Sequence, residues 1–518
     1  MSDRKMNIPN LSSQKTILPA VFLMFAALLL TFQSCKKKRS DIANLLYKKT
    51  PNKVFRKLTH EGYDTVFEQV LNQEKPKLSY PQLISDYYDN NDKDPVFLMQ
   101  HLQNDDLKTM VDYYEKANEQ GLDSNIFDVK QIRLLVNKFY DKKAIKTTDE
   151  AYHDIAELEL LTANSLINYS NALQYGIINP KKIYSRYFMA TKMPDSASMM
   201  QVFATHNFKK YLDSIQPKDP QYIALQKAYV SGTPIAGLSK EESHRVLLVN
   251  LERLRWKNKP TENKYVIVNI ADFHLDVMDS GKSVLNMKVC VGQGRNMDNA
   301  KTLIHFDDTD KVDKPNIHQT PLLNSLIHSV QVNPVWNIPE SIANKEIIVE
   351  AQKDPYYLSN KNIDVYKGDE KIDDTESIDW STADKSEYSF QQEPGADNSL
   401  GKIKFLFNNK SSVYLHDTPA QLPFAQSMRA VSHGCVRLQK PQDFAHALFG
   451  DGPKYDLIAK DMAADKPDPT EIALRPKMSV YITYITCWSD STGTLQYRKD
   501  VYGQDIILYA NLVKALGK

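Results

Sequence analysis

The hydrophobic pattern of the chain changes near residue 264, and this change limits the possible folds more than any other feature. Before it, Thr147 to Tyr175 carries apolar residues mostly three or four positions apart, which is typical of one face of a helix. Thr147 and Glu150 have capping-box spacing, and Gly176 follows as a stop signal. The first half is therefore predicted to be a scaffold of packed helices.

After residue 264, short β-branched runs replace the helical period. Five runs are predicted to be strands: Tyr265–Ile270, Lys282–Val291, Ile403–Phe407, Ser412–His416 and Val480–Thr486. Asp279-Ser280-Gly281 predicts a turn and a hairpin between the first two, and Asn408-Asn409-Lys410 predicts a second hairpin between the next two. Pro441 to Phe449 is predicted to be a short helix. The predicted fold class is α+β, with an all-helical domain before a β-rich domain.

A chain of 518 residues is longer than one hydrophobic core usually supports, so several domains are expected. The predicted segments are 1–35 (signal peptide), 36–84 (linker and start of the scaffold), 85–245 (helical scaffold) and 246–518 (β-rich domain). Residues 340–398, here called the insertion, interrupt the β-rich domain and are acidic in their later part. Such a segment can be a lid or a solvated surface excursion, and both remain open.

The charge balance excludes one class of partner. The chain has 65 basic and 64 acidic residues, for a net charge of +1. A nucleic-acid-binding protein needs a basic footprint to neutralise phosphates, so no nucleic-acid partner is expected.

The N-terminus is predicted to be an export signal. Basic residues precede an apolar run from Ile17 to Phe32, which is shorter than the roughly 20 residues of a membrane-spanning helix. Cys35 follows, and Lys36 to Arg39 are all basic. This arrangement resembles a lipoprotein cleavage site, with Cys35 as the lipidated first residue of the mature chain. An uncleaved signal anchor is the alternative, and both place the later residues outside the cytoplasm.

The segment from Tyr414 to Leu438 carries the chemistry. A cysteine attacks as its thiolate, so a catalytic cysteine needs a neighbouring base or positive charge. Here Cys435 lies near two histidines and two arginines, and His416 ends a predicted strand 19 residues earlier. Gly434 permits an unusual backbone turn that can aim amide N–H groups at an oxyanion. The segment therefore favours a thiol nucleophile.

Two other readings of Cys435 compete with the nucleophile. A buried structural cysteine is common, but the surrounding polar sequence suits a core poorly. A zinc site from His416, His433 and Cys435 is possible by ligand type, but no metal-binding spacing supports it. Cys290 and Cys487 lie in or beside predicted strands and are expected to be packed.

The motif Ser432-His433-Gly434-Cys435-Val436-Arg437, preceded by His416, resembles the signature of L,D-transpeptidases with a YkuD-type catalytic domain. Further segments are similar to the large multidomain subgroup typified by YcbB, and together they cover about residues 245–510. These segments are Val246 to Trp256, Asn333 to Pro339, Pro394-Gly395, Asn398 to Gly401, Lys404-Phe405, His416 to Pro419, and Asp500 to Tyr502 with Asp505. In the helical half, Glu159 to Thr162 is similar to that subgroup's scaffold domain.

The resemblance implies a β-sandwich or barrel-like catalytic domain that remodels peptidoglycan without cofactor or metal. Cys435 would attack residue three of a tetrapeptide stem, releasing D-Ala, and a neighbouring stem's amine would resolve the thioester into a 3→3 cross-link. His416 would be the general base, supported by His433, and the N–H groups of Gly434 and Cys435 would hold the oxyanion. Further contacts with substrate are expected from Ser432, Arg437, Tyr414 and Trp336.

The resemblance also implies that the insertion is a lid and that carbapenem-type inhibitors acylate Cys435. The expected location is the periplasm, on a membrane anchor at Cys35. Two alternatives stay open. The first is an L,D-carboxypeptidase of the same fold, with water as acceptor, and the second is a non-catalytic wall-binding lipoprotein.

Overall fold

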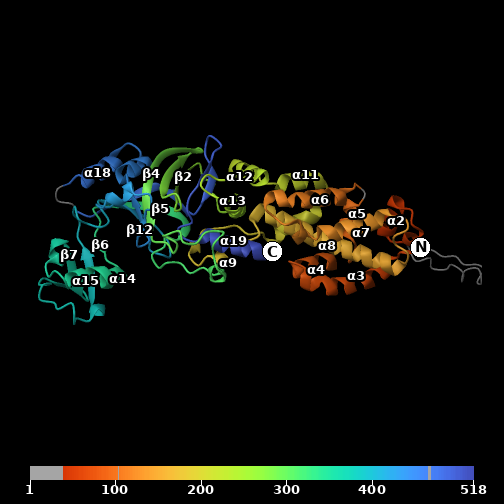
Figure 1. The fold of residues 1–518 in the computed structure, drawn as a ribbon, viewed down its shortest axis with the longest axis horizontal. Coiled ribbons are helices and arrows are strands. Elements are labelled where there is room, and N and C mark those ends of the chain that lie inside the picture. Colours follow the sequence, from red (N-terminus) through yellow and green to blue (C-terminus); the bar gives the residue numbers. More distant parts are fainter. Residues whose placement is uncertain (1–38, 103, 465–467, 518) are drawn as a thin grey trace, which may run out of the picture. The chain divides into compact units, whose positions relative to one another are not determined.

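The computed structural model describes residues 39–102, 104–464 and 468–517, whose elements are labelled in Figure 1. It divides into two compact units. One contains the described residues up to Asp105 together with Leu134–Thr162, and the other contains Asp106–Arg133 and the residues from Ala163 onward. The predicted signal peptide and Cys35 lie outside the described residues. Within the described ranges, no helix is both long and apolar enough to cross a membrane.

The first unit is entirely helical. Its helices are α2 (Asp41–Lys49), α3 (His60–Glu74), α4 (Pro81–Asp89) and α5 (Val96–His101), and α7 (Val129–Tyr140) and α8 (Thr148–Tyr175) contribute to both units. The predicted start of α8 is confirmed, since the Thr147 hydroxyl accepts the Glu150 N–H at 3.1 Å. The fully buried Glu159 on α8 accepts N–H groups of Phe97 and Leu98, both at 2.8 Å. A buried carboxylate thus caps the N-terminus of α5.

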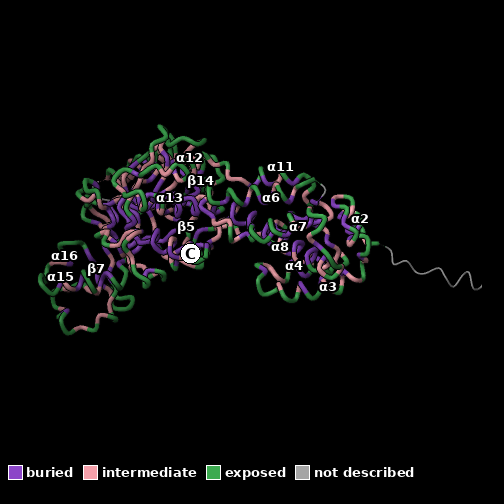
Figure 2. Tube along the Cα trace, turned by 45° about the vertical axis from the view of Figure 1, so that its right-hand side comes forward, coloured by how far each residue is buried: buried purple, intermediate pink, exposed green. Residues whose placement is uncertain are grey.

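The second unit combines helices with a large sheet, so the fold class is α+β as predicted. Its helices before the sheet are α6 (Asp106–Glu115), α9 (Pro180–Ile183), α10 (Ser196–Met200), α11 (Phe208–Ile215), α12 (Pro220–Ser231) and α13 (Lys240–Arg255). Later in the chain come α17 (Pro441–Phe449), which has the predicted bounds, α18 (Pro453–Met462) and α19 (Gln504–Ala515). Buried residues gather around α13, β5 and β14 (Figure 2), and there the core of this unit lies.

The main sheet has ten strands and closes on itself. They are β1 (Tyr187–Phe188), β2 (Lys264–Asn269), β3 (His274–Asp279), β4 (Lys282–Gly292), β5 (Leu322–Val332), β10 (Ile403–Phe407), β11 (Leu415–His416), β12 (Ala430–Ser432), β13 (Val436–Leu438) and β14 (Thr470–Thr483). The order runs β5-β10-β11-β13-β4-β3-β2-β14, and β14 also pairs with β5. Because the first and last strands of this order pair with each other, the sheet forms a barrel-like core in which neither of them is a free edge.

The first predicted hairpin was wrong in one respect. The turn at Asp279–Gly281 exists, but it joins β3 to β4, and β2 pairs with β3 rather than with β4. Strand β3 carries His274, Asp276 and Asp279 between its apolar residues, so it shows no β-branched run. The predicted pairing of the second hairpin, β10 with β11, is confirmed, but β11 begins at Leu415 and not at Ser412, so the connection is longer than the predicted turn at Asn408–Lys410. Strand β14 begins at Thr470, ahead of the predicted start at Val480.

The insertion is a folded subdomain. Its strands β7 (Ile363–Lys367), β8 (Glu370–Ile372) and β9 (Tyr388–Gln392) form a separate sheet with β6 (Trp336–Asn337), which lies just before residue 340. The helices α14 (Glu340–Ile342), α15 (Ile348–Ala351) and α16 (Tyr357–Asn360) belong to the same subdomain. Apolar residues of these elements form a core of their own, which a solvated excursion would lack. At its base, the Asn398 amide donates to the carbonyls of Pro334, Gln392 and Glu393, at 3.0, 3.1 and 3.0 Å.

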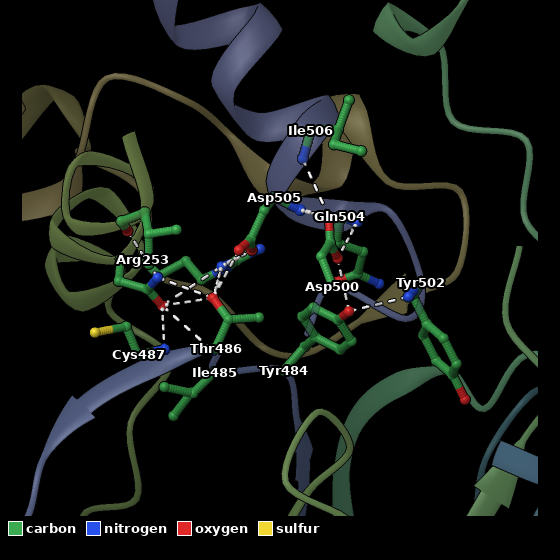
Figure 3. Close-up of polar contacts among 12 residues, drawn as sticks. Arg253, Tyr484, Ile485, Thr486, Cys487, Asp500, Tyr502, Gln504, Asp505 and Ile506 are labelled. Atoms are coloured by element: carbon green, nitrogen blue, oxygen red, sulfur yellow. Dashed lines mark hydrogen bonds and ion pairs between the residues drawn. The ribbon is translucent and has the colours of Figure 1, made fainter. Parts of the chain in front are cut away.

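A buried polar cluster fixes the C-terminal helix of the second unit (Figure 3). The Asp500 carboxylate accepts the N–H groups of Gln504, Asp505 and Ile506 and so caps α19. Burial and the neighbouring Asp505 raise the pKa of Asp500. Arg253 on α13 forms an ion pair with Asp505, so the two helices are joined inside the core.

Candidate active site

Strands β11 and β13 bring the two candidate catalytic side chains together. They pair in parallel, with Leu415 opposite Val436 and His416 opposite Arg437, and Cys435 directly precedes β13. Cys435 and His416 therefore line the same cavity, which has a volume of about 620 Å³. The sequence predicted that the chain between His416 and Cys435 returns far enough to bring the two side chains together, and this register agrees with that prediction.

Cys435 is half-buried, and its sulfur faces Tyr414. Burial raises the pKa of the Cys435 thiol, although donation from the Tyr414 N–H and hydroxyl and the charges of Arg437 and Lys404 oppose this rise. The resting group is therefore a thiol rather than a preformed thiolate. A base must remove its proton when the substrate arrives.

His416 is 4% exposed, and its charge state suits a base. Burial, followed by the Arg437 charge, lowers the pKa of His416 to about 3, so the imidazole is neutral at pH 7. Its Nδ1 lies 2.5 Å from the Asp417 carbonyl oxygen, which fixes the ring. The carbonyls of Asp417 and Leu400 favour the charged form, and would stabilise an imidazolium during proton transfer.

The loop before Cys435 has the predicted glycine geometry but a different hydrogen-bond pattern. Gly434 has a φ of +125°, which favours glycine. Its N–H donates to the Ser432 hydroxyl at 3.1 Å, and that hydroxyl donates to the Cys435 carbonyl at 2.6 Å. The predicted oxyanion role of the Gly434 N–H is therefore corrected, because that N–H is used within the loop. Ser432, expected to contact substrate, lines the cavity and also stabilises the loop.

The Cys435 N–H is the remaining backbone donor of the predicted pair. It has no acceptor among the residues that the structure describes. A free amide beside the nucleophile is the geometry that an oxyanion requires. The Cys435 N–H is thus the better candidate for this role.

Two cations flank His416 across the sheet. Lys404 on β10 and Arg437 on β13 lie directly opposite His416 on the two neighbouring strands. The Lys404 amine lies 5.6 Å from the centre of the Tyr414 ring. The buried Nε of Arg437 has no hydrogen-bond partner within the described ranges, and the Arg437 side chain lines the same cavity as Cys435.

His433 lies at the boundary with the insertion. Its Nε2 is 2.5 Å from a carboxylate oxygen of Glu346, and its ring centre is 4.3 Å from that of His318. Trp336, expected to contact substrate, lines the cavity together with Ile342 and Glu346. The insertion and its leading strand therefore form one wall of the cavity that holds Cys435.

The zinc alternative finds no support in the geometry. Among the residues with described positions, no group of three or more His, Cys, Asp or Glu side chains could hold a metal ion. Cys290 and Cys487 are buried, as expected, at 0% and 1% exposure. Of the three cysteines whose positions the structure describes, Cys435 is the one that lines this cavity, among polar side chains.

Comparisons with known families assign both halves of the chain. Residues 263–449 match the model of the L,D-transpeptidase catalytic domain, and residues 82–228 match that of a scaffold domain. The chain carries an L,D-transpeptidase catalytic domain behind a scaffold domain. This is the architecture of the YcbB-like subgroup, and the catalytic-domain match includes His416, Cys435 and the insertion.

One curated relative is similar to part of this chain. It is a Haemophilus influenzae protein named "Putative L,D-transpeptidase", 27% identical over 326 residues. The match covers 62% of this chain and spans 61% of that protein's length.

The L,D-transpeptidase site also contains residues that sequence reasoning missed. Lys404 was noted only as part of a motif, and Glu346 and His318 were not identified. Alternation along β10 could have placed Lys404 on the same face as His416, had the hairpin register been known. No local sequence pattern marks Glu346 or His318.

Replacing Glu346 with glutamine should loosen the contact between the insertion and His433. A partly exposed ion pair contributes up to about 1 kcal/mol. Bulky maleimides should therefore modify Cys435 about two- to fivefold faster, because this wall of the cavity opens more readily. Small iodoacetamide should react at an unchanged rate. Peptide mass spectrometry of the Cys435 fragment measures both rates.

Glu350→Gln is the matched control for this change. Glu350 lies on the same insertion and forms its ion pair with Lys353, also inside the insertion. Equal acceleration in both variants would show that the Glu346 contact does not limit access to Cys435.

Proposed function

We propose that this chain is a peptidoglycan L,D-transpeptidase that forms 3→3 cross-links through a thioester on Cys435. The observation that supports it is one cavity lined by a thiol, a neutral imidazole and a guanidinium, from Cys435, His416 and Arg437. These groups supply a nucleophile, a proton acceptor and a carboxylate-binding cation.

The first half-reaction acylates the enzyme. The Cys435 sulfur attacks the carbonyl carbon of residue three of a tetrapeptide stem while His416 accepts the thiol proton. The Cys435 N–H donates to the tetrahedral oxyanion, and Tyr414 lies beside the sulfur. Collapse of this intermediate breaks the bond to D-Ala, whose nitrogen takes the proton from His416. A thioester and free D-Ala result.

The second half-reaction transfers the acyl group. A side-chain amine of a neighbouring stem attacks the thioester carbonyl, and His416 accepts a proton from that amine. The carbon–sulfur bond breaks, and the proton returns to sulfur. An amide joins residue three of one stem to residue three of the other. Water in place of the amine would give a tripeptide, the product of an L,D-carboxypeptidase.

Analysis of purified sacculi after incubation with the protein tests this proposal. We expect dimers joined 3→3 and an equivalent amount of released D-Ala. Tripeptide monomers without dimers would indicate the carboxypeptidase, and unchanged sacculi would indicate a wall-binding protein without catalysis. These products differ in mass, so liquid chromatography with mass spectrometry separates the three outcomes.

An envelope location accompanies this function as part of the proposal. A lipid on Cys35 would hold the catalytic domain at a membrane that faces the wall, and the basic residues after it would lie against anionic headgroups. The mass of the mature N-terminal peptide would show whether Cys35 is acylated.

A further inference from the structure

A buried network joins the C-terminal segment to the loop of the nucleophile. The Tyr502 hydroxyl donates to the Gly292 carbonyl at 2.7 Å and accepts the Thr320 N–H at 3.1 Å. The Thr320 hydroxyl accepts the Gly292 N–H and donates to the Gly434 carbonyl, both at 2.8 Å. Tyr502 and Thr320 are fully buried, so water does not compete for these bonds.

Gly292 shows how closely these segments approach. A Cβ atom at Gly292 would lie 1.8 Å from the His318 carbonyl oxygen, 2.8 Å from the Thr320 nitrogen and 3.0 Å from the Gly434 Cα. Only glycine fits between these backbones. The end of β4, the segment around Thr320 and the loop at Gly434 therefore form one rigid assembly.

The Gly434 carbonyl and the Cys435 N–H belong to the same peptide unit. In a planar trans peptide these two groups point in opposite directions, so fixing one orients the other. The Thr320 hydroxyl holds the carbonyl of Gly434, whose φ is +125°. Because glycine has no Cβ, sterics alone would restrict this peptide unit little. The Cys435 N–H is thereby directed to the opposite side, where it has no acceptor among the described residues.

We propose that Thr320, held in place by Tyr502, is a positioning residue that orients the Cys435 N–H toward the oxyanion. The inference rests on the proposed function, and it adds two residues outside the motif that contains Cys435. Tyr502 is itself fixed from behind, because its N–H donates to the Tyr484 hydroxyl at 3.0 Å, and its ring points away from the Asp500 cluster (Figure 3).

Two reagents separate this role from a general structural role. Acylation of Cys435 by a carbapenem passes through a tetrahedral oxyanion, whereas alkylation by iodoacetamide does not. Removing one oxyanion donor costs about 10²–10³ in rate, so misdirecting it in Thr320→Val should slow acylation roughly 10- to 100-fold. Alkylation should change less than about twofold, since its rate reports the thiolate. Thr320→Ser, which keeps the hydroxyl, should restore most of the acylation rate.

Tyr502→Phe tests the role of Tyr502 in positioning Thr320, and it keeps the aromatic ring in place. It removes one hydroxyl and should also slow acylation more than alkylation, by roughly 5- to 20-fold. Tyr184→Phe is the matched control, because the buried Tyr184 hydroxyl donates at 2.7 Å to the Gln504 carbonyl on the same C-terminal segment. It should lower the melting temperature similarly and leave the ratio of the two rates unchanged.

The results distinguish this inference from the proposed function. If carbapenem does not acylate the wild-type protein at Cys435, the proposed function fails before any variant is measured. If wild type is acylated but the variants slow acylation and alkylation equally, or slow neither, the positioning role is wrong. Should Thr320→Val not fold, Tyr502→Phe against Tyr184→Phe gives the same decision.

Discussion

Replacing Cys435 with serine should abolish 3→3 cross-linking and carbapenem acylation, with a loss of at least about 10³-fold. A serine hydroxyl is far less acidic than a thiol, and the neutral His416 is too weak a base to ionise it. Intact-mass spectrometry after carbapenem treatment should show one adduct on the wild type and none on the variant. Muropeptide analysis of the same samples measures the cross-links.

Cys290→Ala is the control for the serine variant. Cys290 lies on β4 in the same sheet but is fully buried. It should keep the adduct, because the Cys290 side chain is fully buried and does not line the cavity. An adduct that persists in Cys435→Ser, or that maps to another residue, would contradict the assignment of the nucleophile.

Replacing His416 with glutamine should lower the acylation rate about 10²- to 10⁴-fold while the protein stays folded. Glutamine is similar in size but cannot accept the thiol proton. Carbapenem acylation kinetics at pH 7 measure the loss. A variant that acylates at the wild-type rate would show that another group, or solvent, removes the proton from Cys435.

The same substitution should also change how stability depends on acid. The pKa of His416 falls from 6.5 to about 3 on folding, so the unfolded chain binds a proton that the native ring refuses. This contribution to stability is complete above pH 6.5 and is lost as the pH falls toward 3. The wild type should lose about 3 kcal/mol of unfolding free energy from this group between pH 6.5 and about pH 4, and His416→Gln should not.

Denaturant unfolding at several pH values measures this difference. His446→Gln is the control, because that histidine lies on α17 with about half of its side chain exposed. Its removal should leave the acid dependence close to that of the wild type. An identical dependence in all three proteins would mean that His416 is not buried as a neutral ring.

Local features of the fold were predictable from sequence, whereas the arrangement around the nucleophile was not. The start of α8 and the bounds of α17 follow from caps and stop signals within a few residues. The approach of His416 to Cys435 could be predicted because His416 ends a predicted strand and Cys435 follows 19 residues later, just before the strand that pairs with it. Strand β3 was missed because its charged residues hide the β-branched pattern.

The supports of the loop depend on contacts far apart in sequence. Thr320 reaches Gly434 across 114 residues, and Tyr502 reaches Thr320 across 182. Neither contact leaves a periodic pattern, since a buried threonine or tyrosine in a core looks the same whether or not its hydroxyl holds a loop. The hydrogen bond from the Gly434 N–H to the Ser432 hydroxyl could not be predicted either. A motif shows which residues are adjacent in sequence, but not which N–H groups already donate a hydrogen bond.

The insertion is anchored to the barrel at its base and also touches the loop of the nucleophile. Asn398 ties the incoming and outgoing chain together, Glu346 contacts His433, and the insertion's own core keeps it folded. Substitutions in its wall of the cavity other than at Glu346 therefore leave the strands that carry thiol and imidazole in place, and grafting a different insertion at that base would change the shape of the cavity wall.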